Sequence, residues 1–530
     1  MATVRANTKV KGASPSPGCS PMDAPSQCPV IDFLANPANH GGVPVERIDT
    51  HISTLFLAGD RVFKLKKAVR LSFLDFTTLT ARRDACEAEL TINRRTAPDL
   101  YLRVVAITRE ADGTLAFDGA GPAEEWVVAM HRFDQATLFD RMIESGGLNT
   151  DLIDGLTDAV AACHANAPIR RDKGGRAEIA RVIDSNSEAL RACVPAILDE
   201  AEIKALDAAT RSALDRLSPL LERRREAGLV RACHGDLHLG NICLVEGRPT
   251  LFDAIEFSEN LSCIDLFYDL AFLLMDLNHR GQRALACRVM NRYLDRTGDY
   301  DGTAALPLFL SLRAAIRAMV LATSAAATTD TPVRERQGAE AKAYLAAARA
   351  YLVPPPPRLV AVGGLSGSGK SRLGRDLAPL LGVPGAVVVR SDAVRKQLLG
   401  VAPDCRLGPE SYNEAVTDRT YRTMVETCAH LLAAGVPVIA DAVFAKPEQR
   451  ATIEAIATTV ALPFTGFWLE VAPEIAAARI VQRRPDVSDA TPEVLSRQLT
   501  YSTGPIAWAR IDSGQDKPAT LAAARILLGL

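Results

Sequence analysis

The sequence predicts two domains of different fold class, a bilobal α+β domain followed by an α/β domain with a parallel sheet. Three observations predict this. The chain has 530 residues, which is too long for one ordinary hydrophobic core. Four consecutive prolines at 354–357 interrupt a helical pattern, and such a run favours a stiff extended spacer. Strand-like and then helical patterns precede the prolines, whereas a strand, a glycine-rich loop and a helix follow them directly.

These breaks set the expected boundaries. We expect a disordered leader at 1–28, the first domain at 29–352, a proline linker at 353–357 and the second domain at 358–530. The leader is rich in Ser, Pro, Lys and Arg and lacks the apolar core of a signal sequence. A transit-like peptide is the alternative for this segment.

The composition is that of a soluble globular protein. Hydrophobic residues make up 48%, charged residues 23%, and the net charge is -2. This balance gives no general attraction to nucleic acid or to an anionic membrane. No apolar run approaches the roughly 18 to 20 residues of a membrane helix. The 11 cysteines form no C-x-x-C pair, which favours reduced, buried thiols in a cytoplasmic protein over zinc ligands or disulfides.

The first domain begins with a predicted β-hairpin that is expected to cover a nucleotide. Residues 51–56 and 61–65 have strand patterns and flank a turn at 58–60. Lys64 on the second strand is the candidate for pairing with nucleotide phosphates. Lys66 lies on the same strand face and is its competitor.

A helix predicted at 82–95 offers carboxylates for that lysine. Protein kinases position the strand lysine with a glutamate of such a helix, and the candidates here are Glu87 and Glu89. We prefer Glu89 and leave Glu87 open. Further strands are expected at 101–108, 115–117 and 125–133, and the residues from 138 to 229 have a helical pattern.

Residues 234–241, with the sequence HGDLHLGN, indicate a phosphoryl-transfer loop. Asp236 lies two residues after His234, and Asn241 lies five residues after Asp236, which matches the protein-kinase catalytic loop H-x-D-L-x-x-x-N. In that loop the Asp handles the acceptor hydroxyl and the Asn holds a metal ion. A short hairpin predicted after Asn241 brings Asp253 to the neighbouring strand end, where both could reach one metal ion.

These motifs, together with DLFYDLA at 265–271, resemble the aminoglycoside phosphotransferase family of protein-kinase-like folds. The resemblance covers roughly residues 30–350. It implies Asp236 as the general base or hydroxyl-orienting group and His238 as a supporting loop residue. It also implies Asn241 and Asp253 as Mg²⁺ ligands.

Two features refine this resemblance. The hairpin holds one glycine, Gly59, instead of the G-x-G-x-x-G cover of protein kinases, so we expect poorer shielding of the phosphates. Asp269 is expected to anchor the catalytic loop rather than to act chemically.

A second phosphate-binding motif follows the prolines. A strand predicted at 358–363 leads into GLSGSGKS at 364–371, which fits the Walker A pattern G-x-x-x-x-G-K-S between a strand and a helix. The glycines of such a loop let backbone N–H groups surround phosphate, the lysine reaches the terminal phosphates, and the serine ligates Mg²⁺. The residues expected to bind nucleotide are Gly364, Gly367, Ser368, Gly369, Lys370 and Ser371.

The next predicted strands end in charged residues. The strand at 386–390 leads into Asp392 and Arg395, and the strand at 436–440 ends at Asp441. Ligands collect at the carboxyl ends of parallel strands, so we expect Asp392 and Arg395 beside the transferable phosphate. Asp441 is expected to act as a Walker B carboxylate for Mg²⁺. Helix capping is the alternative for both acids.

A helix predicted at 473–482 ends in an arginine-bearing segment. Arg483 and, one turn earlier, Arg479 are placed to stabilise the transferring phosphate as part of a lid. A solvated, charged helix end is the alternative.

Residues 358–530 resemble the small P-loop kinases of the polynucleotide-kinase-like and zeta-toxin-like group. The resemblance implies Asp392 as the base that activates an acceptor hydroxyl and Arg395 as a ligand of the acceptor. The whole chain looks like bacterial proteins that fuse an aminoglycoside-phosphotransferase-like domain to an AAA-type P-loop ATPase or kinase domain.

These motifs predict a bifunctional phosphotransferase that uses ATP and Mg²⁺, with one active site per domain and hydroxyls of small molecules (sugar, metabolite or antibiotic) as acceptors. One alternative is that one domain is a nucleotide-binding sensor for its neighbour. Another is that the second domain phosphorylates polynucleotide 5'-hydroxyls, although the sequence has no broad basic stripe. We expect a cytoplasmic protein with a small-molecule acceptor and no nucleic-acid or membrane partner, and we leave the oligomeric state open.

Overall fold

The computed structural model describes residues 27–71, 74–482 and 488–530. Within these ranges the chain forms two compact units. The N-terminal unit comprises the described residues up to Asp276 together with 311–349, and the C-terminal unit comprises 277–310 together with the described residues from Ala350 onward. Residues 277–310 thus group with the second unit, which differs from the division that the proline run predicts.

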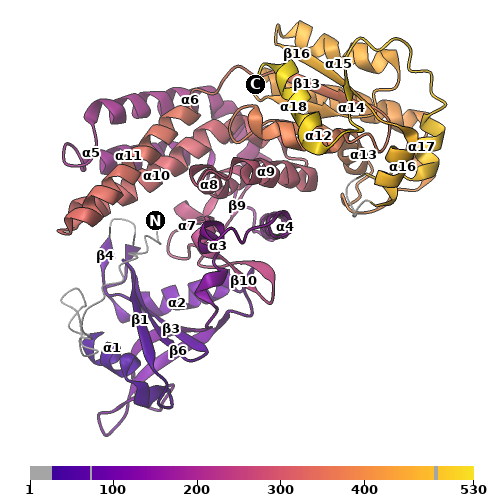
Figure 1. Ribbon diagram of the computed structural model, residues 1–530. Coiled ribbons are helices and arrows are strands. Elements are labelled where there is room, and N and C mark those ends of the chain that lie inside the picture. The colour runs from indigo at the N-terminus through magenta and orange to yellow at the C-terminus, as the bar shows by residue number, and fades with distance from the viewer. Residues whose placement is uncertain (1–26, 72–73, 483–487) are drawn as a thin grey trace. The chain divides into compact units, whose positions relative to one another are not determined.

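An antiparallel six-stranded sheet forms the first lobe of the N-terminal unit (Figure 1). Its order is β1-β2-β3-β8-β6-β7, and the hairpin expected to cover a nucleotide pairs Ala58 with Arg61 across Gly59. The strands are β1 (Val45–Asp49), β2 (Ser53–Ala58), β3 (Arg61–Lys66), β6 (Tyr101–Arg109), β7 (Leu115–Phe117) and β8 (Ala123–His131). A small separate hairpin joins β4 (Arg70–Leu71) to β5 (Leu74–Asp75).

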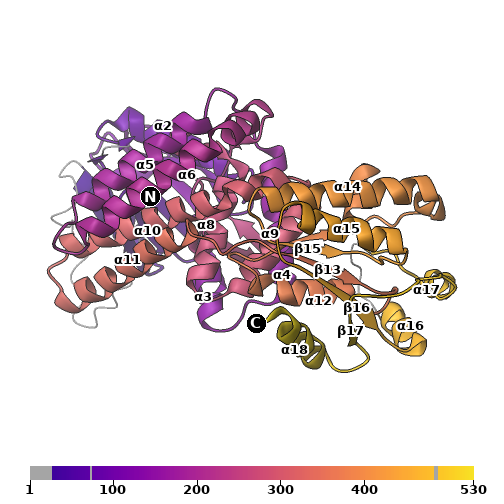
Figure 2. The same cartoon turned by 90° about the horizontal axis from the view of Figure 1, so that it is seen from above.

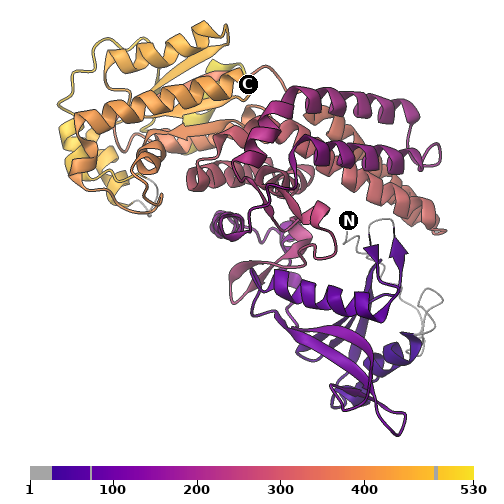
Figure 3. The same cartoon turned by 180° about the vertical axis from the view of Figure 1, so that it is seen from behind.

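Both faces of this sheet are covered because its strands carry apolar side chains in both directions (Figures 1 and 3). Phe56 packs with α1 (Cys28–Ala35) on one face, and Leu57 packs with α2 (Leu79–Asn93) on the other. The apolar residues near Val30 therefore form a helix. Gln27, expected in the leader, is buried and donates to the Lys66 carbonyl at 2.9 Å.

The second lobe is mostly helical, as the pattern after residue 138 predicts (Figure 2). Two hairpin-like pairs of strands interrupt it around the catalytic loop. Its helices are α3 (Phe139–Glu144), α4 (Thr150–Asn166), α5 (Gly175–Arg191), α6 (Glu200–Glu226), α7 (Glu259–Ser262), α8 (Leu266–His279), α10 (Leu306–Ala327) and α11 (Thr331–Tyr351). The paired strands are β9 (Val230–Ala232) with β12 (Cys263–Asp265), and β10 (Ile242–Val245) with β11 (Arg248–Leu251).

The C-terminal unit is an α/β fold whose five-stranded sheet is parallel throughout, with the order β14-β15-β13-β16-β17. Helices α14 and α15 lie on one face, and α12 and α18 on the other (Figure 2). The strands are β13 (Leu359–Gly363), β14 (Val387–Arg390), β15 (Val438–Asp441), β16 (Phe464–Glu470) and β17 (Ala509–Asp512). The helices are α12 (Lys370–Leu377), α13 (Ser391–Leu398), α14 (Glu414–Ala433), α15 (Pro447–Thr459), α16 (Pro473–Val481), α17 (Pro492–Gln498) and α18 (Lys517–Leu528).

Helix α9 (Arg283–Thr297) and the 3-10 helix η5 (Tyr300–Ala305) belong to this second unit. Cys287 of α9 is 2% exposed and lies in one core cluster with Ala386 and Val388. Val388 belongs to the edge strand β14, and Ala386 directly precedes that strand. Sequence patterns show where a helix begins and ends but not which core its apolar face enters, and this explains the difference from the predicted boundary.

Two expectations from composition need correction. Among the described residues, the helical stretch 300–327 is long and apolar enough to cross a membrane, and 72% of its most apolar window is buried. Counting uninterrupted apolar residues misses it because Arg313 and Arg317 divide the run. Of the cysteines in the described ranges, nine are free thiols as expected, with Cys405 exposed, but Cys28 is disulfide-bonded.

Candidate active sites

In the N-terminal unit, Lys64 lies between two of the predicted site carboxylates. Its Nζ donates to Glu89 Oε1 at 2.7 Å and to Asp253 Oδ1 at 2.6 Å. Glu89 is fully buried, whereas Glu87 is exposed on the same helix. Of the two glutamates left open by the sequence, Glu89 is therefore the one that contacts Lys64.

Lys66, the competing lysine, is part of the same cluster. Its Nζ lies 2.5 Å from Glu89 Oε2 and also contacts Glu256. Both lysine side chains point to one face of β3 because residues two apart in a strand share a face. The sequence indicated the shared face but not that both lysines would join one cluster, and nothing in it pointed to Glu256.

Lys64 and Glu89 hold each other in the ionised state, whereas the charge of Glu256 is disfavoured. Burial alone would lower the pKa of Lys64, but Asp253 and Glu89 raise it well above its ordinary value. The pKa of Glu89 is lowered despite burial, because Lys64 and Lys66 favour the carboxylate. The pKa of Glu256 is raised, because burial and the neighbouring Glu89 disfavour its charge more than Lys66 favours it.

Asp269 of α8 anchors the catalytic loop, as expected. Its two carboxylate oxygens accept the backbone N–H groups of His234 at 3.0 Å and Gly235 at 2.9 Å. His164 of α4 contacts the same carboxylate at 3.2 Å. Gly235 has a φ of +83°, and an added Cβ would lie 2.9 Å from the Leu261 carbonyl oxygen, so this tight turn favours glycine.

The loop places Asp236 and Asn241 in direct contact. The Asn241 Nδ2 donates to the backbone oxygen and to Oδ2 of Asp236, both at 3.0 Å. His238 lies 3.5 Å from the Asp236 carboxylate and accepts the Gly240 N–H, which fits the supporting role implied for it. The strand pair β10 and β11 brings Asp253 close to Asn241, since the Phe252 N–H donates to the Asn241 carbonyl at 3.0 Å.

Two residues that the sequence did not single out fix the backbone around Asp253. The Tyr101 hydroxyl accepts the Asp253 N–H at 3.1 Å, and the Asn93 side chain accepts the Ala254 N–H at 2.8 Å. Asp253 itself has a φ of +62°, which is uncommon for a residue other than glycine. These contacts hold the Asp253 carboxylate toward Lys64.

The donor atoms of this site fit a magnesium ion. Asn241 Oδ1 is buried and has no hydrogen-bond partner among the described residues. A buried oxygen without a partner is costly, so a bound cation would satisfy it. Carboxylate and amide oxygens of the Asp253 and Asn241 kind are the ligands that Mg²⁺ prefers.

In the C-terminal unit the glycine-rich loop adopts the conformation that its glycines allow. Gly364, Gly367 and Gly369 have φ values of +135°, +80° and +91°. An added Cβ on Gly367 would lie 2.5 Å from the Ala476 carbonyl oxygen, so the loop approaches α16 too closely for a side chain. Ser368 Oγ is buried without a hydrogen-bond partner among the described residues.

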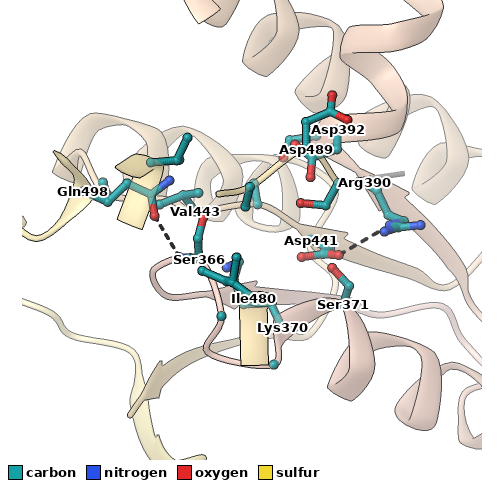
Figure 4. A pocket seen from close by; sticks show the side chains of 18 of the residues that line it. Ser366, Lys370, Ser371, Arg390, Asp392, Asp441, Val443, Ile480, Asp489 and Gln498 are labelled. Carbon is teal, nitrogen blue, oxygen red and sulfur yellow. Dashed lines mark hydrogen bonds and ion pairs between the residues drawn. The ribbon is translucent and has the colours of Figure 1, made fainter. Parts of the chain in front are cut away.

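This loop opens a cavity of about 640 Å³ at the carboxyl ends of the strands (Figure 4). The cavity is lined by Lys370 and Ser371, by Asp392 and by Asp441. Figure 4 shows the Ser371 hydroxyl and the Asp441 carboxylate pointing toward each other. A hydroxyl and a carboxylate are oxygen ligands that fit Mg²⁺.

Arg395 also lines the cavity, and the fold constrains its guanidinium. Its Nη1 donates to the Ser411 carbonyl at 2.9 Å, and its guanidinium lies 4.7 Å from the ring centroid of Tyr412. The side chain is 5% exposed. Arg395 is therefore a fixed cation in the wall of the cavity.

Two charged residues that line this cavity, Arg390 and Asp489, and the adjoining Lys396 were missed as site residues. Arg390, at the end of β14, lies 3.8 Å from the Asp441 carboxylate. Lys396 pairs with Asp489 at 3.2 Å, and the Tyr412 hydroxyl donates to the same Asp489 carboxylate at 3.0 Å. The position of Arg390 at a strand end could have identified it as a site residue from the sequence. The contact of Lys396 with Asp489 could not have been predicted, because the two residues are 93 positions apart.

The expected lid is only partly described. Arg479 lines the cavity and donates to the Ser513 carbonyl at 2.8 Å. Arg483 lies outside the described residues, so its predicted role has no structural test.

Comparison with known protein families matches both units. The model of the phosphotransferase enzyme family matches residues 79–306, and the model of an AAA domain matches residues 359–505. The first of these ranges includes α9, although α9 belongs to the C-terminal unit of the structure.

Curated relatives match nearly the whole chain. The uncharacterized protein Rv2004c of Mycobacterium tuberculosis and the uncharacterized protein Mb2027c of Mycobacterium bovis are each 30% identical over 476 residues. Each alignment covers 86% of this chain and 90% of the relative.

Solved structures resemble each part separately and weakly. A choline/ethanolamine kinase family protein from Mesorhizobium loti covers 62% of this chain and 96% of its own, with 14% identity and a TM-score of 0.36. The APS kinase CysC of Mycobacterium tuberculosis, in complex with AMPPNP and APS, covers 33% of this chain and 98% of its own, with 19% identity and a TM-score of 0.26.

The family matches and the site geometry agree on the class of protein. A phosphotransferase domain precedes a nucleotide-binding P-loop domain, so the protein is a kinase-like phosphotransferase. The chain belongs to the same family as the mycobacterial proteins Rv2004c and Mb2027c, and it joins a phosphotransferase enzyme domain to an AAA domain.

Proposed function

We propose that each unit is an ATP-dependent phosphotransferase with its own active site, and that each transfers the γ-phosphoryl group to a hydroxyl of a small molecule. The observation that supports this is that each unit brings together a candidate base, a lysine for the phosphates and oxygen ligands for Mg²⁺. In the first unit these are Asp236, Lys64 and the pair Asn241 with Asp253.

In the N-terminal site the acceptor hydroxyl attacks the γ-phosphorus, and the bond from this phosphorus to the bridging oxygen of ADP breaks. Asp236 orients the hydroxyl and takes its proton. Lys64 holds the nucleotide phosphates, and Glu89 keeps Lys64 in place. When bound at Asn241 and Asp253, Mg²⁺ neutralises charge on the phosphates.

In the C-terminal site Asp392 takes the proton of the acceptor hydroxyl, and Lys370 reaches the terminal phosphates. Lys370 Nζ donates to the Leu365 carbonyl at 2.8 Å, and this bond would be exchanged for phosphate. Ser371 and Asp441 supply the Mg²⁺ ligands, while Arg395 is a ligand of the acceptor. Arg483 remains a candidate for stabilising the transferred group.

Two variants of the full chain test the proposal. Asp253→Asn is expected to abolish transfer by the N-terminal site and to spare the C-terminal site, and Lys370→Ala is expected to do the reverse. Each protein is incubated with ATP and a pool of metabolites, and product masses are read for an added phosphate. Full ATP consumption by both variants would contradict the assignment of the residues.

The same assay separates the alternatives. A unit that binds ATP but transfers phosphate to no acceptor would be a nucleotide sensor. Phosphorylation of a 5'-hydroxyl oligonucleotide that is lost in Lys370→Ala would make the second unit a polynucleotide kinase. A cytoplasmic location is part of the proposal, and the nine free thiols among the described cysteines favour it.

A further inference from the structure

Helix α9 is fastened to the edge strand of the C-terminal sheet. The Asn291 side chain accepts the Val388 N–H at 2.7 Å and donates to the Ala386 carbonyl at 3.0 Å. One amide thus pairs with the free edge of β14 as a neighbouring strand would. Cys287 packs so closely that a Cβ added to Gly385 would lie 2.5 Å from its sulfur.

Further contacts hold both ends of this segment. Gln397 of α13 donates to the Leu294 carbonyl at 3.3 Å, and Arg296 pairs with Asp404 at 3.4 Å. Asp301 of η5 pairs with His430 of α14 at 2.8 Å. At the other end of α9, Arg283 donates to the Gly382 carbonyl, so the helix is held at both ends.

This attachment brings one carboxylate of α9 to Arg390, a residue that lines the cavity. Asp295 Oδ2 lies 3.4 Å from Arg390 Nη1, and Asp441 Oδ2 lies 3.8 Å from Arg390 Nε. All three side chains are largely buried, with exposed fractions of 14%, 6% and 5% for Asp295, Arg390 and Asp441. One guanidinium is thus shared between two carboxylates, and its closer contact is with Asp295 (Figure 4 shows the contact of Arg390 with Asp441).

We propose that Asp295 is a positioning residue of the C-terminal site, which holds Arg390 back from Asp441 and so leaves the Asp441 carboxylate available to Mg²⁺. Without Asp295, Arg390 would close on Asp441 and compete with the cation for the same oxygens. Helix α9 lies within the residues that the phosphotransferase family model matches, and it would then contribute a residue that supports the C-terminal site. The proposal rests on the metal-ligand role of Asp441 in the proposed function.

The test uses the full chain in an Asp253→Asn background, which removes the proposed metal ligand of the N-terminal site. Mg²⁺ is titrated by calorimetry into protein saturated with a non-hydrolysable ATP analogue, and the analogue itself is titrated in EDTA. We expect Asp295→Asn to weaken Mg²⁺ binding about tenfold, because a charge contact of the buried guanidinium is lost. Affinity for the analogue in EDTA is expected to stay unchanged, since the ion pair that the variant weakens is with Arg390 and not with the glycine-rich loop.

Three further variants test whether Asp295 affects Mg²⁺ binding through Arg390. Asp295→Glu should recover part of the Mg²⁺ affinity. In an Arg390→Met background, Asp295→Asn should have no further effect, because the competing cation is gone. Asp301→Asn is the matched control, since it removes an ion pair from the same segment but away from the cavity, and it should change neither titration.

Specific results would overturn the proposal. Unchanged Mg²⁺ affinity in Asp295→Asn would do so, as would an effect of full size in the Arg390→Met background. A parallel loss of analogue affinity in EDTA would show that Asp295 only maintains the fold. The variant Asp441→Asn distinguishes a failure of this proposal from a failure of the proposed function. If Asp441→Asn leaves Mg²⁺ binding intact, Asp441 is not a metal ligand, and the proposal for Asp295 fails as well.

Discussion

At the scale of single residues, the Glu89 carboxylate is shared between two buried lysines. Lys64 and Lys66 each contact one of its oxygens. With Asp253 and Glu256, three carboxylates surround two ammonium groups, so the cluster carries an excess negative charge. Burial raises the pKa of Glu256, and the neighbouring Glu89 raises it further; three carboxylates in one cluster also suit a site that binds a cation.

Replacing Glu89 by Gln should therefore destabilise the N-terminal unit. Two buried ammonium groups would lose a common partner, and breaking a buried ion pair from one side costs about 3 kcal/mol. Urea unfolding at neutral pH measures this loss. Glu87→Gln is the control, because Glu87 is exposed on the same helix, and an equal effect of the two variants would contradict the assignment.

The same carboxylate should make stability depend on acid. The folded-state pKa of Glu89 is lowered from 4.5, so its stabilising contribution is fully present above pH 4.5 and is lost as the pH falls through the folded-state pKa. We expect the free energy of unfolding to fall less steeply below pH 4.5 in Glu89→Gln than in the wild type. Unfolding curves over this range measure the difference, and parallel curves would refute it.

At the scale of elements, the glycine-rich loop depends on its close approach to α16. Gly367→Ala would strain the backbone at φ +80° and bring a methyl group against the Ala476 carbonyl. The displaced loop should bind nucleotide more than about tenfold less tightly, because catalytic loops tolerate little misplacement. Calorimetric titration of the C-terminal site with an ATP analogue tests this.

Gly435→Ala offers a matched control for that variant. Gly435 has nearly the same φ, +82°, but an added Cβ would meet nothing within 4 Å. This variant should cost only the backbone strain of about 1 kcal/mol and leave nucleotide affinity unchanged. Equal loss of affinity in both variants would mean that a general weakening of the fold, and not the contact with α16, lowers nucleotide affinity.

At the scale of the whole molecule, the C-terminal unit is assembled from two stretches of chain. A fragment of residues 350–530 lacks α9 and therefore exposes the edge of β14 and the apolar side chains that Cys287 covers. We expect it to unfold roughly 10 °C below the corresponding transition of the full chain, since a few kcal/mol are lost from a unit of this size.

Thermal unfolding followed by circular dichroism measures this difference. The full-length variant Asn291→Ala provides an intermediate case, because it removes the two hydrogen bonds to β14 but keeps the helix. A fragment that unfolds at the same temperature as the full chain would show that α9 contributes nothing to the fold of the second unit.

The sequence by itself determined the two fold classes and most of the residues around each candidate site. Motif spacing was sufficient because a catalytic loop or a glycine-rich loop is short, and its backbone conformation depends on residues close together in the chain. Asp236 with Asn241, and Lys370 with Ser371, are set by such local spacing. Between Glu87 and Glu89 the sequence left the choice open with a preference for Glu89, and it is Glu89 that contacts Lys64 in the structure.

The tertiary structure alone decided the contacts between distant segments. Glu256 beside Lys66, Asp489 beside Lys396 and Asp295 beside Arg390 join residues separated by more than 90 positions. No periodicity or motif connects such pairs, because burial of apolar faces determines which segments meet. For the same physical reason, four prolines could mark a break in the chain but could not show that α9, which precedes them, packs into the core of the unit that follows.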